Sequence, residues 1–315
     1  MADFEEQLAR LQDKIRDLQA FAREQGLDLR REILALEQKA AELRARMYAS
    51  LSPWQKVQLA RDVRRPTTLD YIDMLFTDFI QLHGDRQYRD DPALVGGIAR
   101  LEGKPVTVLG HQKGRDTKDN IARNFGMPHP EGYRKALRLM EQAEKFGRPV
   151  ICFIDTPGAY PGLGAEERGQ GEAIARNLRA MAALAVPVLA VVTGEGGSGG
   201  ALALGVGDAL LMLEHAVYSV ISPEGCAAIL WKDSSRAREA AAALKLTAQD
   251  LARLGVADEV IPEPQGGIQK DWQAGARAVK EALVRHLDIL SGLSADTLLR
   301  RRQRRLAAIG QWREH

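Results

Sequence analysis

The feature that most constrains this chain is a glycine-rich segment that follows a short apolar run. Residues 186–192 are apolar, which is typical of a buried strand, and residues 193–202 read TGEGGSGGAL. Glycine has no Cβ and tolerates positive φ, so five glycines here predict a close approach of the backbone to another group. Small apolar residues at 201–206 predict a short buried helix, whose first N–H groups have no partner within the helix. The sequence therefore predicts a binding site made of backbone amides.

Three functional interpretations of this segment compete with a structural one, in which the glycines only let a small helix pack tightly on a sheet. The first is a dinucleotide site, because Gly194, Gly196 and Gly199 match the GxGxxG fingerprint. That site needs a helix of normal length before the next strand, and the next apolar run, at 209–213, begins too soon. The dinucleotide interpretation is therefore disfavoured.

The second interpretation is a serine hydrolase, and the third is an oxyanion hole without a side-chain nucleophile. Residues 196–200 match the GxSxG nucleophile elbow, which places Ser198 between a strand and a helix. Such an enzyme also needs an acid and a histidine, and His215 and His286 are the candidates before the C-terminal residue. The third interpretation needs only N–H groups aimed at an oxygen that becomes negative. Both stay open at this point.

Composition and charge exclude several other classes of protein. The chain has 315 residues, 45% hydrophobic and 27% charged, with no apolar run of membrane-spanning length and no signal peptide. Cys152 and Cys226 are far apart and lack metal-ligand spacing, so we expect a cytoplasmic protein without bound metal or a disulfide framework. A net charge of +2 is too small to indicate nucleic acid. We expect the basic run at 300–305 to be a solvated helix face.

Hydrophobic periodicity divides the chain into three parts. Residues 1–50 carry apolar residues at spacings of three and four with a break at Gly26, which predicts a helical hairpin. Residues 51–290 predict an α/β body, and residues 291–315 predict a basic C-terminal helix. Early in the body, the apolar spacing predicts one helix that runs from about Thr67 to the turn at His83.

A second glycine-rich turn follows another predicted strand. The apolar run at 149–154 ends in residues 155–162, DTPGAYPG, and a helix is predicted at 165–184. The carboxyl ends of strands in open α/β sheets are where ligands bind. We therefore expect Gly158 and Ala159 to line the same pocket as the glycine-rich segment.

A basic loop follows the predicted strand at 105–109. It contains Lys113 and Arg115, which are candidate anchors for an anionic group at a strand end. The alternative is an exposed loop that is merely rich in cations. The sequence does not decide between the two.

Seven motifs in this order resemble those of the carboxyltransferase α-subunit family of bacterial acetyl-CoA carboxylases. Each motif alone is modest, but the ordered set is specific and the likeness covers nearly the whole chain. One departure is residues 266–271, GGIQKD, which replace a histidine-containing sequence and put only a peripheral contact in doubt. The motifs are HGDR at 83–86, QKGR at 112–115, RNFGM at 123–127, PEGYRKA at 130–136, DTPGAYPG at 155–162, EGGSGG at 195–200 and SVISPEG at 219–225.

The resemblance implies a crotonase-like (ClpP/crotonase) spiral of ββα units with an N-terminal helical hairpin and C-terminal helices. It implies transfer of a carboxyl group from carboxybiotin, carried on the biotin carboxyl carrier protein, to acetyl-CoA, which gives malonyl-CoA for fatty acid synthesis. The implied partners are a carboxyltransferase β subunit in an α₂β₂ assembly and biotin carboxylase. In this family the zinc ribbon belongs to the β subunit, so no metal is expected on this chain.

The implied chemistry and the glycine-rich segment meet at one point. Both half-reactions place negative charge on an oxygen, the ureido oxygen of biotin or the thioester oxygen of acetyl-CoA, and neither needs a protein nucleophile. The resemblance therefore assigns the oxyanion hole to Gly199 and Gly200, while Gly196 and Gly197 shape the turn. The proton acceptor implied is the biotin nitrogen, so no side chain is assigned as general base.

Overall fold

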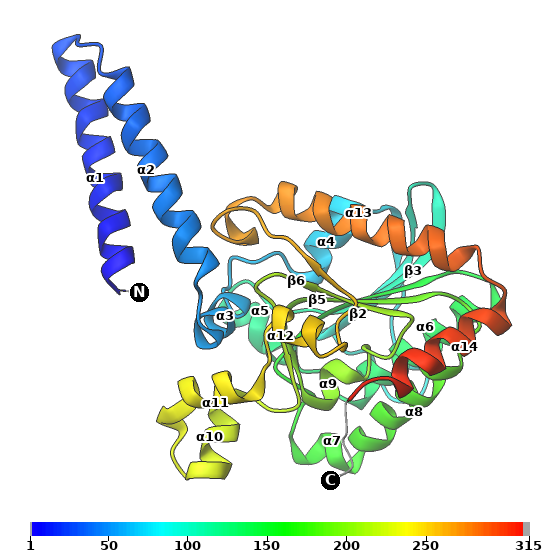
Figure 1. The fold of residues 1–315 in the computed structure, drawn as a ribbon. Coiled ribbons are helices and arrows are strands. Elements are labelled where there is room, and N and C mark those ends of the chain that lie inside the picture. The colour runs from blue at the N-terminus through cyan, green and yellow to red at the C-terminus, as the bar shows by residue number, and fades with distance from the viewer. Residues whose placement is uncertain (1, 311–315) are drawn as a thin grey trace.

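The computed structural model describes residues 2–310, which form a helix-covered sheet with a long helical hairpin at its N-terminal end (Figure 1). The sheet has eight strands in the order β1-β2-β3-β4-β5-β6-β8, with β7 paired to the end of β5. The strands are β1 Thr77–Gln81, β2 Leu94–Leu101, β3 Lys104–His111, β4 Val150–Thr156, β5 Val188–Gly197, β6 Ala209–Leu213, β7 Val217–Ser219 and β8 Glu259–Ile261.

The first three strands of the sheet pair antiparallel, and every later pair is parallel. Strands β4 and β5 lie at the centre and are buried along their whole length, as their continuous apolar runs predict. The hairpin of β2 and β3 is followed by a helix, so these elements form one ββα unit.

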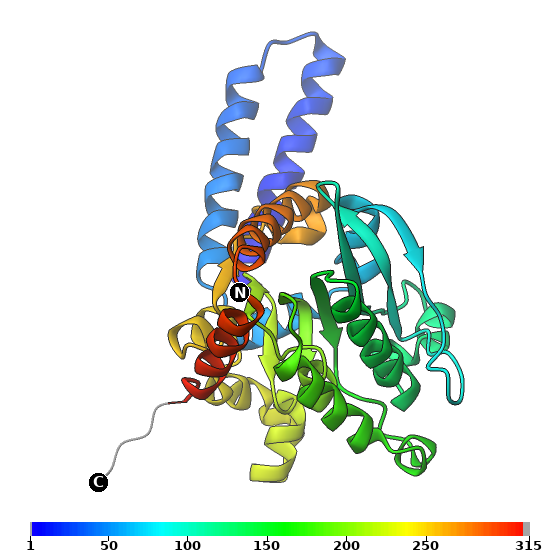
Figure 2. The ribbon, with the colours of Figure 1, turned by 90° about the vertical axis from the view of Figure 1, so that its right-hand side faces the viewer.

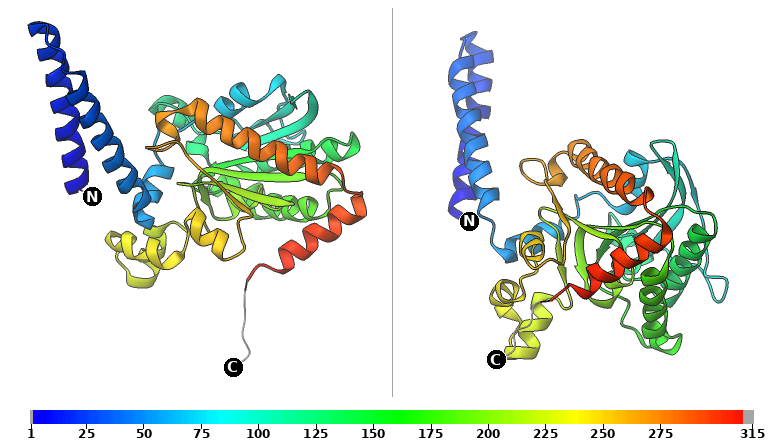
Figure 3. Two further views of the ribbon diagram at one scale, coloured as in Figure 1. Left: turned by 45° about the horizontal axis from the view of Figure 1, so that its top comes forward. Right: turned by 45° about the vertical axis from the view of Figure 1, so that its right-hand side comes forward.

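Helices cover both faces of the sheet (Figures 1 and 3). Helices α4 and α13 lie on one face, and α6 and α8 pack against each other on the other. The helices are α1 Ala2–Gln25, α2 Arg30–Ala49, α3 Pro53–Ala60, α4 Thr68–Leu75, α5 Thr117–Ala122, α6 Pro130–Lys145, α7 Leu163–Glu167, α8 Gln170–Ala183, α9 Ser198–Leu202, α10 Pro223–Trp231, α11 Ala237–Leu244, α12 Ala248–Arg253, α13 Trp272–Ser291 and α14 Ala295–Ala307.

The predicted N-terminal hairpin is present, and it projects from the body (Figures 1 and 2). Among residues 10–48 of the hairpin, the buried side chains are those of Ala40, Leu43 and Met47, at the end of α2 nearest the body. The side-chain amide of Gln265 donates a 2.9 Å hydrogen bond to the backbone carbonyl of Ala41 and connects the hairpin to the body. The division of the chain at residues 50 and 290 stays a prediction.

The single helix predicted from Thr67 to His83 is wrong beyond Leu75. Its start is correct, because the N–H of Thr67 donates to Asp70 in a capping box. At Phe76 the backbone becomes extended, with φ −120° and ψ 159°, and residues 77–81 form β1 against β2. Apolar residues at 76, 79 and 80 fit helical spacing, but the pairing with a distant strand decides the structure.

Two other predicted helices differ from the structure, one in its length and one in the burial of a side chain. The helix predicted at 165–184 is divided into α7 and α8, because Gly169 adopts a left-handed conformation with φ 81°. The basic run at 300–305 is mostly exposed as predicted, but the Arg302 side chain is fully buried. Arg302 therefore anchors α14 to the body rather than facing water.

Candidate active site at the ends of strands β4 and β5

The glycine-rich segment is the end of strand β5 rather than a loop after it. Pairing with β4 passes from Ile154 opposite Val192 to Thr156 opposite Gly196, so β5 carries two extra residues in a bulge. At this bulge the N–H of Glu195 donates a 2.9 Å hydrogen bond to a carboxylate oxygen of Asp155. The predicted turn therefore begins later, after β5 has also paired with β7.

The two glycine-rich segments meet directly, with no side chains between their backbones. A Cβ on Gly197 would lie 2.1 Å from the carbonyl oxygen of Pro157. A Cβ on Gly200 would lie 2.4 Å from the nitrogen of Ala159 and 2.9 Å from the hydroxyl oxygen of Tyr133. Both positions require glycine because these contacts are far shorter than van der Waals distance. The two strand ends therefore pack tightly together, and the shared pocket expected of Gly158 and Ala159 stays a prediction.

Substitution of Gly200 by alanine is expected to destabilise the protein. The added methyl group meets backbone atoms of the neighbouring turn, and overpacking of this kind costs about 1–3 kcal/mol. Gly171 of α8 is the matched control, because a Cβ there meets nothing within 4 Å. We expect thermal unfolding to show a lower melting temperature for Gly200→Ala and an equal or higher one for Gly171→Ala. Equal melting temperatures for Gly200→Ala and the unmodified protein would contradict this packing.

Helix α9 presents backbone amides at the end of β5. Ser198 is exposed and has φ 56°, so the chain turns sharply where the helix begins. The N–H groups of Ser198, Gly199 and Gly200 lie in the first turn, where no intrahelical partner exists. Within residues 2–310, none of these three donates to a backbone carbonyl outside α9. Gly199 is half-buried, and a Cβ there would meet only Ile174, at 3.6 Å.

His111 supports this helix from the interior. Its Nε2 lies 3.1 Å from the carbonyl oxygen of Gly200 and donates to it, because a carbonyl can only accept. Burial lowers the pKa of His111 to about 4, so the ring is neutral at physiological pH. A neutral ring with its proton on Nε2 holds the end of the first turn without adding charge to the site.

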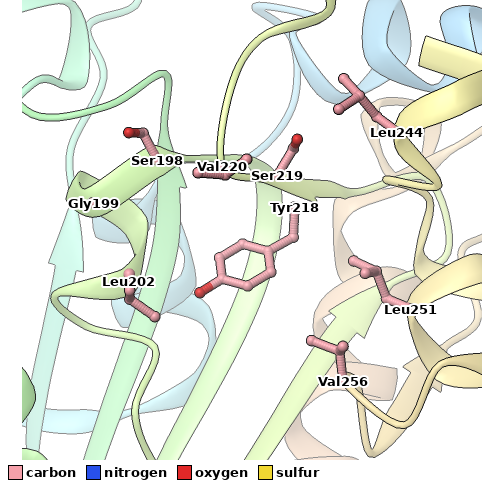
Figure 4. A pocket seen from close by; sticks show the side chains of 9 residues that line it. All are labelled: Ser198, Gly199, Leu202, Tyr218, Ser219, Val220, Leu244, Leu251 and Val256. Atoms are coloured by element: carbon pink, nitrogen blue, oxygen red, sulfur yellow. The ribbon is translucent and has the colours of Figure 1, made fainter. Parts of the chain in front are cut away.

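A cavity of about 350 Å³ opens beside α9 (Figure 4). Ser198 and Gly199 lie on one side of it, and the Tyr218 ring projects into it from β7. The rest of the lining is mainly apolar. Of the predicted site residues, only Gly199 lines this cavity; Gly196 and Gly197 line a smaller one, and Gly158 and Ala159 lie against α9. The lining residues are Ser198, Gly199, Leu202, Tyr218, Ser219, Val220, Leu244, Leu251 and Val256.

Lys113 and Arg115 lie away from this cavity, and each is paired with a carboxylate. Lys113 Nζ lies 2.6 Å from Asp155 Oδ1, the oxygen that also accepts from the Glu195 amide. Arg115 pairs with Asp70, and its guanidinium lies 5.1 Å from the centre of the Trp272 ring. Lys113 therefore helps to fix the bulge in β5, and an anion-binding role of either residue stays a prediction.

Sequence reasoning missed the arginines that brace the back of β5. Arg61 bridges Glu195 and Glu224, with N–O distances of 2.6 Å to each. Arg65 donates to the carbonyl of Thr193, at 2.9 Å, and pairs with the buried Glu263. Arg61 caps the C-terminal end of α3 and Arg65 lies between α3 and α4, far in sequence from the strand that they hold. No local motif marks them, so only the fold reveals this role.

The serine hydrolase interpretation lacks its histidine. His286 Nε2 lies 2.9 Å from Glu259, and the His215 ring lies 5.7 Å from that of Tyr48. Between residues 2 and 310, no histidine side chain hydrogen-bonds to Ser198. The same part of the chain contains no group of three or more His, Cys, Asp or Glu residues that could hold a metal ion. It also contains no helix with the length and apolar character needed to cross a bilayer.

Comparison with structures of known proteins supports the fold. Transcarboxylase 12S aligns with a TM-score of 0.59 and 19% identity, over 81% of this chain and 46% of that chain. The geranyl-CoA carboxylase β subunit of P. aeruginosa gives a TM-score of 0.56 and 17% identity, over 78% and 46%. This chain thus spans less than half of either protein. The fold is the crotonase-like one of these carboxyltransferases.

Comparison of sequences identifies the family. The acetyl-coenzyme A carboxylase carboxyl transferase subunit alpha of Shouchella clausii is 58% identical over 308 residues, which cover 98% of this chain and 95% of that protein. The subunit of the same name from Syntrophotalea carbinolica is 59% identical over 308 residues, covering 98% and 97%. Residues 1–310 match the family described as acetyl co-enzyme A carboxylase carboxyltransferase-like. The chain belongs to this carboxyltransferase family.

Proposed function

We propose that this chain is the α subunit of an acetyl-CoA carboxylase carboxyltransferase. In this proposal it transfers the carboxyl group of carboxybiotin, carried on a biotin carboxyl carrier protein, to acetyl-CoA and forms malonyl-CoA for fatty acid biosynthesis. Full-length identity near 58% to subunits of that name supports the assignment. The structural observation that carries it is the set of free amides at the end of β5, beside a cavity of about 350 Å³.

In this proposal the chain stabilises negative charge on an oxygen of the reacting biotin or thioester. The N–H groups of Gly199 and Gly200 are fixed donors, because the preceding residues of β5 pair with β4 and β7 and Gly200 packs against the 157–159 turn. Donors fixed before the reaction need no reorganisation when charge develops, and one such donor contributes about 3 kcal/mol or more. Gly199 is the better placed of the two, since it lines the cavity whereas Gly200 is buried. Gly196, Gly197, Gly158 and Ala159 support these donors by close packing.

The residues around the cavity fit the head group of biotin. Biotin supplies a carboxyl group that it carries on a ring nitrogen and releases readily. Pockets for small ligands have volumes from about 300 Å³ upward and combine an apolar lining with a few polar groups. This cavity has that composition: Leu202, Val220 and Leu251 provide apolar surface, while Ser198 and Gly199 bring backbone amides to its edge.

Exposed apolar side chains next to the cavity support a partner subunit. Val220 is 78% exposed and lines the cavity, and Ile229 and Leu230 of α10 are 71% and 64% exposed. Helices α10 and α11 protrude from the body (Figure 1). Several exposed apolar side chains in one region of a protein are typical of interfaces. We assign this surface to the carboxyltransferase β subunit of an α₂β₂ assembly, which works with the carrier protein and biotin carboxylase. The free thiols of Cys152 and Cys226 fit a cytoplasmic location.

The test of this proposal is an assay of the reverse reaction with purified subunits, malonyl-CoA and biocytin. We expect no turnover by this chain alone and turnover after addition of the β subunit, because the reaction has two oxyanions and one set of amides is evident here. Acetyl-CoA formation is the measurement. Full turnover by the isolated chain would contradict the need for a partner, and no turnover by the mixture would contradict the proposed activity.

Substitution of Ser198 by alanine separates this proposal from the serine hydrolase alternative. The backbone amides remain, so we expect the kcat of the assembled enzyme to fall by less than about tenfold. Loss of a nucleophile would instead reduce the rate by about a millionfold. Labelling with a fluorophosphonate provides a second readout, and we expect none on Ser198. Labelling of Ser198 together with an inactive alanine variant would overturn the oxyanion assignment.

A further inference from the structure

The cavity beside α9 contains a side chain that its apolar lining does not explain. Tyr218 lies on β7, and its backbone N–H donates to the carbonyl of Leu246, at 3.0 Å. Its ring projects into the cavity, with the hydroxyl directed toward Leu202 (Figure 4). Leu202, Val256 and Leu251 surround the cavity with apolar surface. The phenol is therefore the largest polar side chain in the lining.

Two glycines seat the Tyr218 ring. A Cβ on Gly196 would lie 2.5 Å from a ring carbon of Tyr218, and a Cβ on Gly205 would lie 2.8 Å from its hydroxyl oxygen. Any larger residue at either position would displace the ring. Gly196 therefore does more than shape the chain, since it makes room for an aromatic side chain. The ring is fixed from both sides, which is the condition for a precise ligand contact.

The Tyr218 hydroxyl makes no hydrogen bond with another group among residues 2–310, and it is not one of the fully buried unpaired polar atoms, so it is accessible from the cavity. An accessible hydroxyl without a protein partner can bond to water or to a ligand. Burial raises the pKa of Tyr218 to about 12, so the phenol stays protonated and can donate. A donor that is fixed, protonated and unpaired at the edge of a cavity is suited to an oxygen of a ligand.

We propose that Tyr218 is a ligand-contacting residue, whose hydroxyl donates a hydrogen bond to an oxygen of the biotin head group in the cavity and orients it toward the α9 amides. The inference rests on the proposed function. It adds a side chain to a site that is otherwise made of backbone. It also gives a reason for Gly205, which lies outside the glycine-rich segment. Tyr218 sets the orientation of the ligand, while the amides stabilise charge.

The test compares Tyr218→Phe with the unmodified protein, in each case assembled with the β subunit. Phenylalanine keeps the ring between Gly196 and Gly205 and removes only the hydroxyl. We expect biocytin to bind about three- to tenfold more weakly, as measured by ligand-detected NMR titration, because one neutral hydrogen bond is lost. The KM for biocytin should rise by a similar factor, whereas the KM for malonyl-CoA and the melting temperature should not change.

Tyr71→Phe is the matched control. The Tyr71 hydroxyl is buried without a partner among the described residues, and its ring stacks on Phe153 in the core, 5.3 Å away, and does not line the cavity. We expect no change in biocytin binding for this variant. Equal biocytin affinity of Tyr218→Phe and the unmodified assembly, with turnover intact, would overturn the role of Tyr218 alone. Absence of both biocytin binding and turnover in the unmodified assembly would overturn this inference together with the proposed function.

Discussion

Replacement of Arg302 by alanine is expected to lower the free energy of unfolding by about 3–5 kcal/mol, because it leaves a buried carboxylate without its partner. The Arg302 and Asp208 side chains are both completely buried, with an N–O distance of 2.7 Å. The guanidinium also donates to the carbonyls of Met181, Leu184 and Val186, at 2.7–2.9 Å. All five N–H groups of the side chain can thus be used.

Denaturant unfolding of the two variants Arg302→Ala and Arg301→Ala measures this effect. Arg301 is exposed, so its substitution removes the same charge from the same helix without opening the core. We expect the Arg301 variant to stay within about 0.5 kcal/mol of the unmodified protein. A loss of less than 1 kcal/mol for Arg302→Ala would mean that α14 does not depend on this ion pair for its attachment.

The buried arginine shows where reading the basic run as a solvated face fails. Five of the six residues at 300–305 are arginines, so residue type does not indicate which of them is buried. Leu298 lies four residues before Arg302, on the same face of α14, and is also buried. The spacing of four residues from an apolar side chain therefore indicates that Arg302 faces the body of the protein. The partner, Asp208, is far away in sequence, so the ion pair itself could not be predicted.

The central strands and the close packing of the glycines were predictable for a different reason. Apolar runs at 149–154 and 186–192 match β4 and β5 because strands buried on both faces carry no alternation. The glycines at the end of β5 and the start of α9 indicate a close approach of backbones, although the sequence does not name the partner segment. The bulge at Glu195 and the arginine braces Arg61 and Arg65 depend on contacts between distant segments. The same holds for β1, whose residues fit a helix until β2 pairs with them.

Resemblance to a family and physical reasoning contributed different parts of the site. Glycine spacing alone left a nucleophile elbow and an oxyanion hole as alternatives, and the ordered motifs favoured the second. The structure then distinguishes the glycines from one another. Gly197 and Gly200 are required by packing against the 157–159 turn, whereas Gly199 has space around it and faces the cavity. The assignment of catalysis therefore depends most on Gly199.

Replacement of the Gly199 amide by an ester is expected to reduce kcat of the assembled enzyme by about 100- to 1,000-fold, with little effect on folding. Incorporation of glycolic acid at position 199 exchanges the N–H for an oxygen and adds no side chain. One lost oxyanion donor costs about 3–4 kcal/mol in the transition state. Among residues 2–310 this N–H donates to no backbone carbonyl outside α9, so its removal should leave the melting temperature nearly unchanged.

The same ester at Gly171 is the matched control, because Gly171 is the second residue of α8 as Gly199 is of α9. Each ester also makes the carbonyl of the preceding residue, Ser198 or Gln170, a weaker hydrogen-bond acceptor. Of the two glycines, only Gly199 lines the cavity. The decisive measurement is kcat of the two ester variants in the malonyl-CoA and biocytin assay with the β subunit. We predict a loss of about 100-fold or more at Gly199 and normal turnover at Gly171. Normal turnover at Gly199, or an equal loss at both positions, would contradict the proposal that this backbone N–H stabilises the reacting oxygen.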